Sequence, residues 1–120
     1  MLVAFGLVYL PKGFAFIDLF RIGYDNRHPR DQQAKLEGWP KRAIAAHLNG
    51  FESFPAFGIA ILMAYVAKST TTYVHALAIT YLVARTIYPV LYIANIHALR
   101  TIVWTVGVLS VVALMVLASL

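Results

Sequence analysis

The sequence predicts an all-α membrane protein, a bundle of four transmembrane helices. Hydrophobic residues make up 61% of the 120 residues and charged residues only 12%, whereas soluble domains carry about a quarter charged residues. The apolar residues stand in long continuous blocks, and a segment inside lipid must satisfy its own backbone polar groups, which favours helices. The expected helices cover residues 2–22, 41–67, 72–94 and 99–120 of a single domain.

The first expected helix, 2–22, is interrupted by Pro11, Lys12 and Asp18. A cleaved signal peptide is the alternative for this segment, but it needs a basic start and a small-residue cleavage site, and the segment has neither. The chain contains no cysteine. This excludes a structural disulfide, a thiolate zinc site and a protein thiol nucleophile.

Six basic residues of the chain lie in or beside the polar connection 23–40: Arg21, Arg27, Arg30, Lys35, Lys41 and Arg42. Basic residues of short loops stay on the cytoplasmic side of a membrane. The connection is therefore expected in the cytoplasm, with both termini on the opposite side. Nucleic-acid binding is disfavoured because no soluble domain accompanies the basic cluster. Trp39 and Trp104 are expected as anchors at the membrane interface.

The second expected helix carries Arg42, Asn49 and Glu52 toward membrane depth. An ionisable side chain there costs roughly 2.5–3.5 kcal/mol, so it is a functional candidate by default. Successive helix residues advance by about 100°, which places these three side chains within about 80° of one another. His47 faces another direction and is expected to be a hydrogen-bonded packing residue. A metal site is not expected, because His47 and Glu52 do not share a face.

The third expected helix repeats the pattern with Tyr81, Arg85, Tyr88 and Tyr92, all on one narrow face. A membrane arginine needs a partner, and Glu52 is the expected one. A purely structural interpretation is an Arg85–Glu52 ion pair that holds the bundle together. The functional interpretation is a cytoplasm-facing site for a small anionic zwitterion, because arginines clamp carboxylates and a glutamate accepts an ammonium group.

The run Ala46-His-Leu-Asn-Gly-Phe-Glu52, followed by Pro55, resembles the second-helix motif of the MAPEG superfamily, the membrane-associated proteins in eicosanoid and glutathione metabolism. The Arg85, Tyr88, Tyr92 face and Leu99-Arg100-Thr101 resemble its third helix and the start of its fourth. The chain is most similar to the short bacterial members. The resemblance implies a homotrimer in the bacterial inner membrane, in contact with membrane lipids, with glutathione as co-substrate between subunits and without a metal.

By position in the motif, the resemblance implies that Arg100 is the catalytic residue that faces the glutathione thiolate. The candidate glutathione-binding residues are Arg42, Asn49, Glu52, Arg85, Tyr88 and Tyr92. Ala45 stands where the family pattern has an arginine, and Arg42, one turn earlier on nearly the same face, is the candidate replacement. Ser53 stands where some members carry a tyrosine.

The function that the resemblance implies is a glutathione-dependent transferase or peroxidase that acts on lipophilic electrophiles. The alternative is a non-catalytic MAPEG-like protein that binds lipid or serves as a scaffold, which the alanine at position 45 favours. A transporter or channel is less favoured, because the chain lacks the paired broken helices or repeats that mark midplane transport sites.

Overall fold

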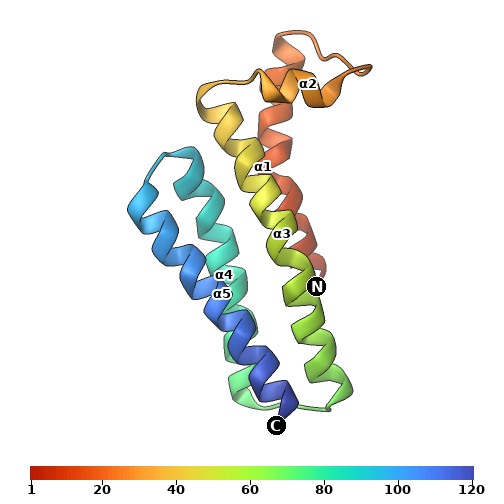
Figure 1. Ribbon diagram of the computed structural model, residues 1–120, viewed down its shortest axis with the longest axis vertical. Helices are drawn as coiled ribbons and strands as arrows, with labels where there is room; N and C mark the ends of the chain where they lie inside the picture. Colours follow the sequence, from red (N-terminus) through yellow and green to blue (C-terminus); the bar gives the residue numbers. More distant parts are fainter.

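The computed structural model describes residues 1–120 and contains four long helices, one short helix and no strand (Figure 1). The helices are α1 (Leu2–Arg21), α2 (Pro29–Ala34), α3 (Gly38–Val66), α4 (Thr72–Ile93) and α5 (His97–Ser119). The ends of the four long helices lie within three residues of the expected positions. The largest difference is at the start of α3, which begins at Gly38 rather than at residue 41.

The polar connection between α1 and α3 is more ordered than a plain loop. It contains α2, whose first residue is Pro29 and whose first turn carries Asp31, both common at helix starts. Gln32 fixes the loop before α2, because its Nε2 donates to the Gly23 carbonyl at 2.7 Å and its Oε1 accepts from the Asp25 backbone N–H at 3.0 Å. The connection therefore has a defined shape at one end of the bundle.

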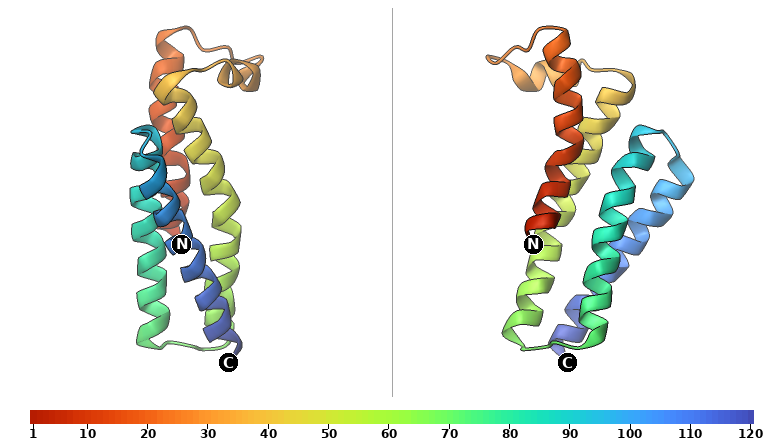
Figure 2. Two further views of the ribbon diagram at one scale, coloured as in Figure 1. Left: turned by 60° about the vertical axis from the view of Figure 1, so that its left-hand side comes forward. Right: turned by 180° about the vertical axis from the view of Figure 1, so that it is seen from behind.

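The long helices are arranged as two antiparallel pairs, α1 with α3 and α4 with α5, and α3 also packs on α4 and α5 (Figure 2). Gly50 allows the close approach of α1, because a Cβ at this position would lie only 3.3 Å from the Cα of Val8. All four long helices contribute to one apolar core, which consists of Ala4, Phe57, Ala60, Ala64, Val74, Tyr81, Val111 and Leu114.

Three helices, α1, α4 and α5, are long and apolar enough to cross a membrane. The 29 residues of α3 correspond to a length of about 43 Å, more than the hydrocarbon thickness of about 30 Å. Large apolar side chains are exposed along the bundle, among them Leu62, Ile79 and Leu109, each about 60% exposed. These features show an integral membrane protein.

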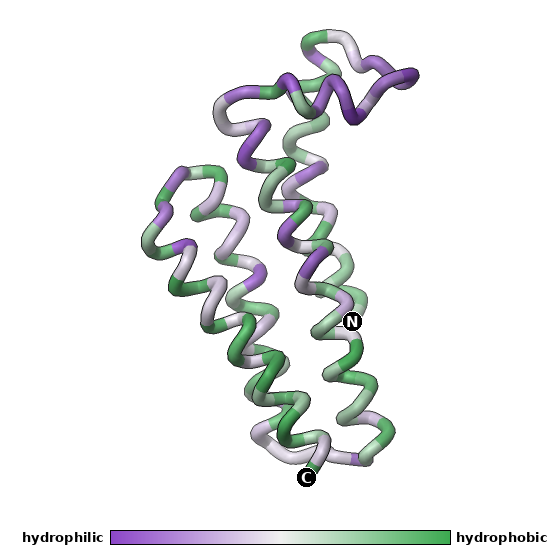
Figure 3. Tube along the Cα trace, viewed as in Figure 1, coloured by the Kyte–Doolittle hydropathy of each residue, from purple (hydrophilic) through white to green (hydrophobic).

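Polar residues are concentrated at the end of the bundle where α2 and the α4–α5 turn lie (Figure 3). The opposite end, near the α3–α4 loop and the C-terminus, is largely apolar apart from the loop itself. Asn49 lies in the first half of α3 and Arg85 in the second half of α4, and these are the halves nearer to α2. The candidate site must therefore be in this half of the bundle.

Candidate functional site

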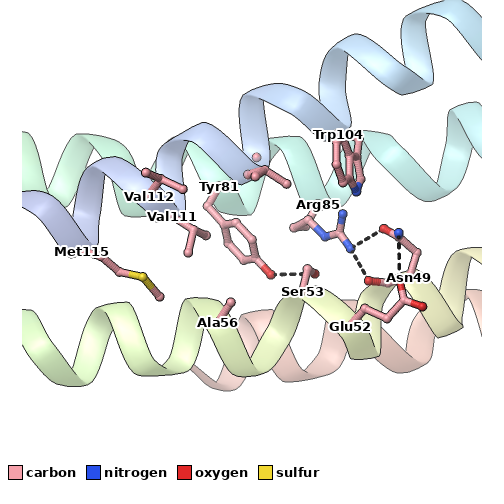
Figure 4. A pocket seen from close by; sticks show the side chains of 12 residues that line it. Asn49, Glu52, Ser53, Ala56, Tyr81, Arg85, Trp104, Val111, Val112 and Met115 are labelled. Atoms are coloured by element: carbon pink, nitrogen blue, oxygen red, sulfur yellow. Dashed lines mark hydrogen bonds between the residues drawn. The ribbon is translucent and has the colours of Figure 1, made fainter.

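The Arg85 side chain of α4 is the centre of a polar cluster inside the bundle. Its Nη2 donates to both the backbone carbonyl and the Oδ1 of Asn49 on α3, each at 2.9 Å (Figure 4). Only 8% of Arg85 is exposed. Gly107 of α5 lies beside the arginine stem, and a Cβ there would be 4.0 Å from the Arg85 Cδ, an ordinary contact distance. The hydrogen bonds to Asn49 of α3 thus determine where this guanidinium lies.

Glu52 is connected to Arg85 only through Asn49, whose Nδ2 donates to the Glu52 Oε2 at 3.4 Å. The expected direct Arg85–Glu52 ion pair was wrong, because the only ion pair within 4.0 Å joins His28 and Asp25 in the α1–α3 connection. The physical reason is the position of Asn49. Asn49 lies about one helical turn before Glu52 and directly opposite Arg85. Its side-chain Oδ1 and its backbone carbonyl oxygen both accept hydrogen bonds from the guanidinium. The Glu52 carboxylate stays exposed.

Arg42 does not join this cluster. Its Nε donates to the backbone carbonyl of Ile93 at 2.8 Å, and Ile93 is the last residue of α4. The last carbonyls of a helix have no partner within the helix, and a cationic side chain is favourable there. Arg42 therefore links the start of α3 to the end of α4. It lines neither of the two hollows described below.

Arg100, near the start of α5, lies over an aromatic ring of α4. Its guanidinium carbon is 4.2 Å from the ring centroid of Tyr92, and that of Arg85 is 4.9 Å from the centroid of Tyr88. The two tyrosine rings contact each other edge to face, with centroids 5.6 Å apart. Such cation–π contacts favour a cation over the ring face. The tyrosines therefore separate and position the two guanidinium groups.

A hollow of about 240 Å³ opens between α3, α4 and the start of α5, and we call it the Arg100 hollow. It is lined by Asn49, Tyr88, Tyr92, Arg100, Thr101 and Trp104. Four of the seven residues predicted for the site therefore surround one space. Glu52 and Arg85 lie outside it, each one hydrogen bond from Asn49.

A second hollow of about 280 Å³ lies between α3, α4 and α5, and we call it the Tyr81 hollow (Figure 4). At one end it is lined by Asn49, Glu52, Ser53 and Arg85, and further along it becomes apolar. Asn49 and Trp104 line both hollows. The two spaces are therefore neighbours that share part of their walls.

Four polar or aromatic residues of these walls were not predicted as site residues: Ser53, Tyr81, Thr101 and Trp104. Trp104 was expected as an interface anchor, yet it contributes to both hollows. It lies four residues after Arg100, so the two side chains share a face of α5, and this spacing was the available signal. The Ser53 hydroxyl lies 3.1 Å from the Tyr81 hydroxyl. That contact joins residues on two helices, and spacing within one helix does not reveal it.

The prediction that His47 is a hydrogen-bonded packing residue is confirmed. Its Nδ1 lies 2.7 Å from the Val8 carbonyl of α1, only 3% of the residue is exposed, and the rings of Tyr9 and Phe51 lie beside it. No three His, Asp or Glu side chains lie close enough together to hold a metal ion.

Taken together, the fold and the polar cluster define an integral membrane protein of the all-α class, with buried arginine and tyrosine side chains and a half-buried asparagine between its helices. The model of the MAPEG family matches the chain over residues 1–120. The chain belongs to this family, whose members are membrane proteins of glutathione and eicosanoid metabolism. No functionally curated protein and no solved structure gave a significant match.

Proposed function

We propose that this protein is a glutathione-dependent transferase or peroxidase that acts on lipophilic electrophiles. The observation that carries the proposal is the position of Asn49. Its side chain holds Arg85 and contacts Glu52, and it also lines the hollow that contains Arg100. Charged and polar groups from α3, α4 and α5 thus surround one region of a chain that belongs to a glutathione-related family.

The chemistry of these groups suits glutathione, which carries two carboxylates, one ammonium group and a thiol. Arginine binds carboxylates through paired hydrogen bonds, and the exposed carboxylate of Glu52 suits the ammonium group. A nearby guanidinium favours a thiolate over a thiol, and Arg100 is the candidate for this role. Arg42 is left with a structural role at the end of α4, because its Nε already donates to Ile93.

In the transferase reaction, the thiolate sulfur would attack an electrophilic carbon, a C–S bond would form, and a leaving group such as halide would depart with its electron pair. In the peroxidase reaction, one thiolate would attack the outer oxygen of a lipid hydroperoxide, the O–O bond would break, and the alkoxide that leaves would take a proton from water to give the alcohol. A second glutathione would then reduce the sulfenic acid of the first, giving the disulfide and water. Arg100 would stabilise the attacking thiolate in both.

The proposed active form is a homotrimer with the site on the cytoplasmic side. The Arg100 hollow, about 240 Å³, is smaller than the 300–1,000 Å³ of typical small-molecule sites. A neighbouring subunit placed over its open side would enclose the remainder of glutathione. The cytoplasmic orientation is supported by the basic α1–α3 connection, which lies at the same end of the bundle as the start of α5, where Arg100 is found. All four long helices would then cross the membrane.

The test compares purified protein in detergent with the variant Arg100→Ala. The unchanged protein should show thiolate absorbance when glutathione is added, and it should conjugate an aromatic halide or reduce a lipid hydroperoxide. Arg100→Ala should lose the thiolate signal and most turnover while it keeps the oligomeric state. Arg21→Ala, which removes an exposed arginine at the end of α1, is the matched control. Absence of both glutathione binding and turnover in the unchanged protein would refute the proposal.

A second candidate function is a non-catalytic lipid-binding or scaffold protein. The observation that favours it is the internal pairing of the buried polar atoms: Arg85 is already bonded to Asn49, and no buried side-chain nitrogen or oxygen lacks a partner. Ala45 also removes a guanidinium that the family pattern supplies. A stable oligomer without any thiolate signal would support this candidate.

A further inference from the structure

The Tyr81 hollow changes character along its length. Its polar end includes Glu52, Ser53 and Arg85, whereas Ala56, Val108, Val111, Val112 and Met115 line the rest. The α5 side of the wall extends from Trp104 to Met115, which corresponds to about 16 Å along the helix axis. A ligand that matches this wall has an apolar chain and a polar group at one end.

The Tyr81 hydroxyl lies where the polar and apolar parts of this wall meet. The ring is stacked on Phe57 with centroids 4.0 Å apart and an angle of 12° between the planes, and only 3% of Tyr81 is exposed. Its hydroxyl lies 3.1 Å from the Ser53 hydroxyl (Figure 4). The stack fixes the ring and Ser53 fixes the hydroxyl, so the phenol oxygen has a defined position.

The Ser53 and Tyr81 hydroxyl groups do not use all of their hydrogen-bond donor and acceptor positions in their contact with each other. The Ser53 Oγ lies 3.2 Å from the Gly50 carbonyl of its own helix. When the Ser53 hydroxyl donates to the Gly50 carbonyl, the Tyr81 hydroxyl donates to the Ser53 oxygen. The Tyr81 oxygen can then accept a hydrogen bond from a ligand O–H. When Ser53 donates to Tyr81 instead, the phenol proton is free for a ligand oxygen. The pair therefore recognises hydroxyl, hydroperoxide and carbonyl groups alike.

We propose that the Tyr81 hollow binds the lipophilic substrate and that Tyr81, held by Ser53, hydrogen-bonds an oxygen atom of it. The preferred class is an apolar chain that bears one hydroxyl, hydroperoxide or carbonyl group. This inference rests on the proposed function, because the hollow shares Asn49 and Trp104 with the Arg100 hollow. An oxygen group on Tyr81 is thereby placed next to the proposed thiolate site. Tyr81 determines specificity and takes no part in thiolate formation.

The test measures binding without glutathione, through quenching of Trp104 fluorescence. The chain has two tryptophans, so Trp39→Phe leaves Trp104 as the only reporter. The probes are a long-chain alcohol brominated at the carbon next to the hydroxyl-bearing one and the matching brominated alkane. Tyr81→Phe removes the hydroxyl and keeps the stacked ring. Tyr73→Phe is the control, since this exposed tyrosine at the start of α4 lies far from the hollow.

Tyr81→Phe should weaken binding of the brominated alcohol about three- to tenfold, the equivalent of one lost hydrogen bond, and leave binding of the alkane unchanged. Ser53→Ala, which leaves the phenol without its holding partner, should change binding in the same direction. Unchanged affinity for the alcohol in Tyr81→Phe, or an equal loss for both probes, would overturn the inference. Selective loss in a protein that shows neither glutathione binding nor turnover would refute the proposed function, while the assignment of the Tyr81 hollow to an oxygen-bearing lipophilic ligand would stand.

Discussion

The hydrogen bonds between Arg85 and Asn49 lead to a quantitative prediction for Asn49→Ala. The substitution removes the Oδ1 acceptor at 2.9 Å, while the Asn49 carbonyl, also at 2.9 Å, remains. It also removes the 3.4 Å contact with Glu52, which contributes little at that length. Hydrogen bonds to charged groups contribute about 1.5–3 kcal/mol in proteins, and bonds between membrane helices average about 0.6. We expect the free energy of unfolding to fall by about 1–2 kcal/mol.

The assay is reversible unfolding in mixed micelles, arranged as a double-mutant cycle with Arg85→Met. Methionine keeps most of the length of the arginine stem and removes the donor, so Asn49→Ala should cost much less in that background. The difference, a coupling of about 1 kcal/mol or more, isolates the pair. Thr80→Ala is the control, because the Thr80 hydroxyl is exposed and bonds only to Ala76 of its own helix. A coupling below about 0.3 kcal/mol would refute the assigned hydrogen bond.

Two further predictions concern the packing of α1 on α3. Gly50→Leu should lower the free energy of unfolding by about 1–3 kcal/mol, because its Cβ would already lie 3.3 Å from the Val8 Cα. The control is Gly13→Leu, where nothing lies within 4 Å of the new Cβ. This variant should unfold with an unchanged free energy in the same titration. His47→Phe keeps an aromatic ring but loses the 2.7 Å bond to the Val8 carbonyl, so we expect a loss of about 0.5–1.5 kcal/mol. Equal stabilities for Gly50→Leu and Gly13→Leu, or an unchanged His47→Phe variant, would contradict the packing described here.

The helices were predictable because their signal is local. The apolar blocks are long, and lipid leaves the backbone few alternatives, so the ends of the long helices were placed within three residues. The short helix α2 was missed, although Pro29 and Asp31 are residues typical of a helix start. Six residues form too short a segment for hydrophobic periodicity to reveal it.

The partner of Arg85 was less predictable. Asn49 and Glu52 are three residues apart on the same face of α3, so angular position did not decide which of them faces Arg85, and the preference for an ion pair led to Glu52. Which of the two residues faces Arg85 depends on the position of α4 along the axis of α3. A helical wheel gives only the angular position of each residue and does not show this axial position. The same shift brings Tyr81 to Ser53 and places Trp104 beside Asn49.

The side-chain hydrogen bonds that connect α3 with α4 involve Arg42, Asn49 and Ser53 on one helix and Tyr81, Arg85 and Ile93 on the other. Within lipid, apolar contacts between helices compete with contacts to equally apolar acyl chains. Apolar surfaces alone therefore specify the alignment of two helices along their axes poorly. These directional bonds act at three levels, and sliding of the α4–α5 hairpin by a single turn would break all of them at once. The alignment of the two halves of the molecule is thus encoded largely by a few polar atoms.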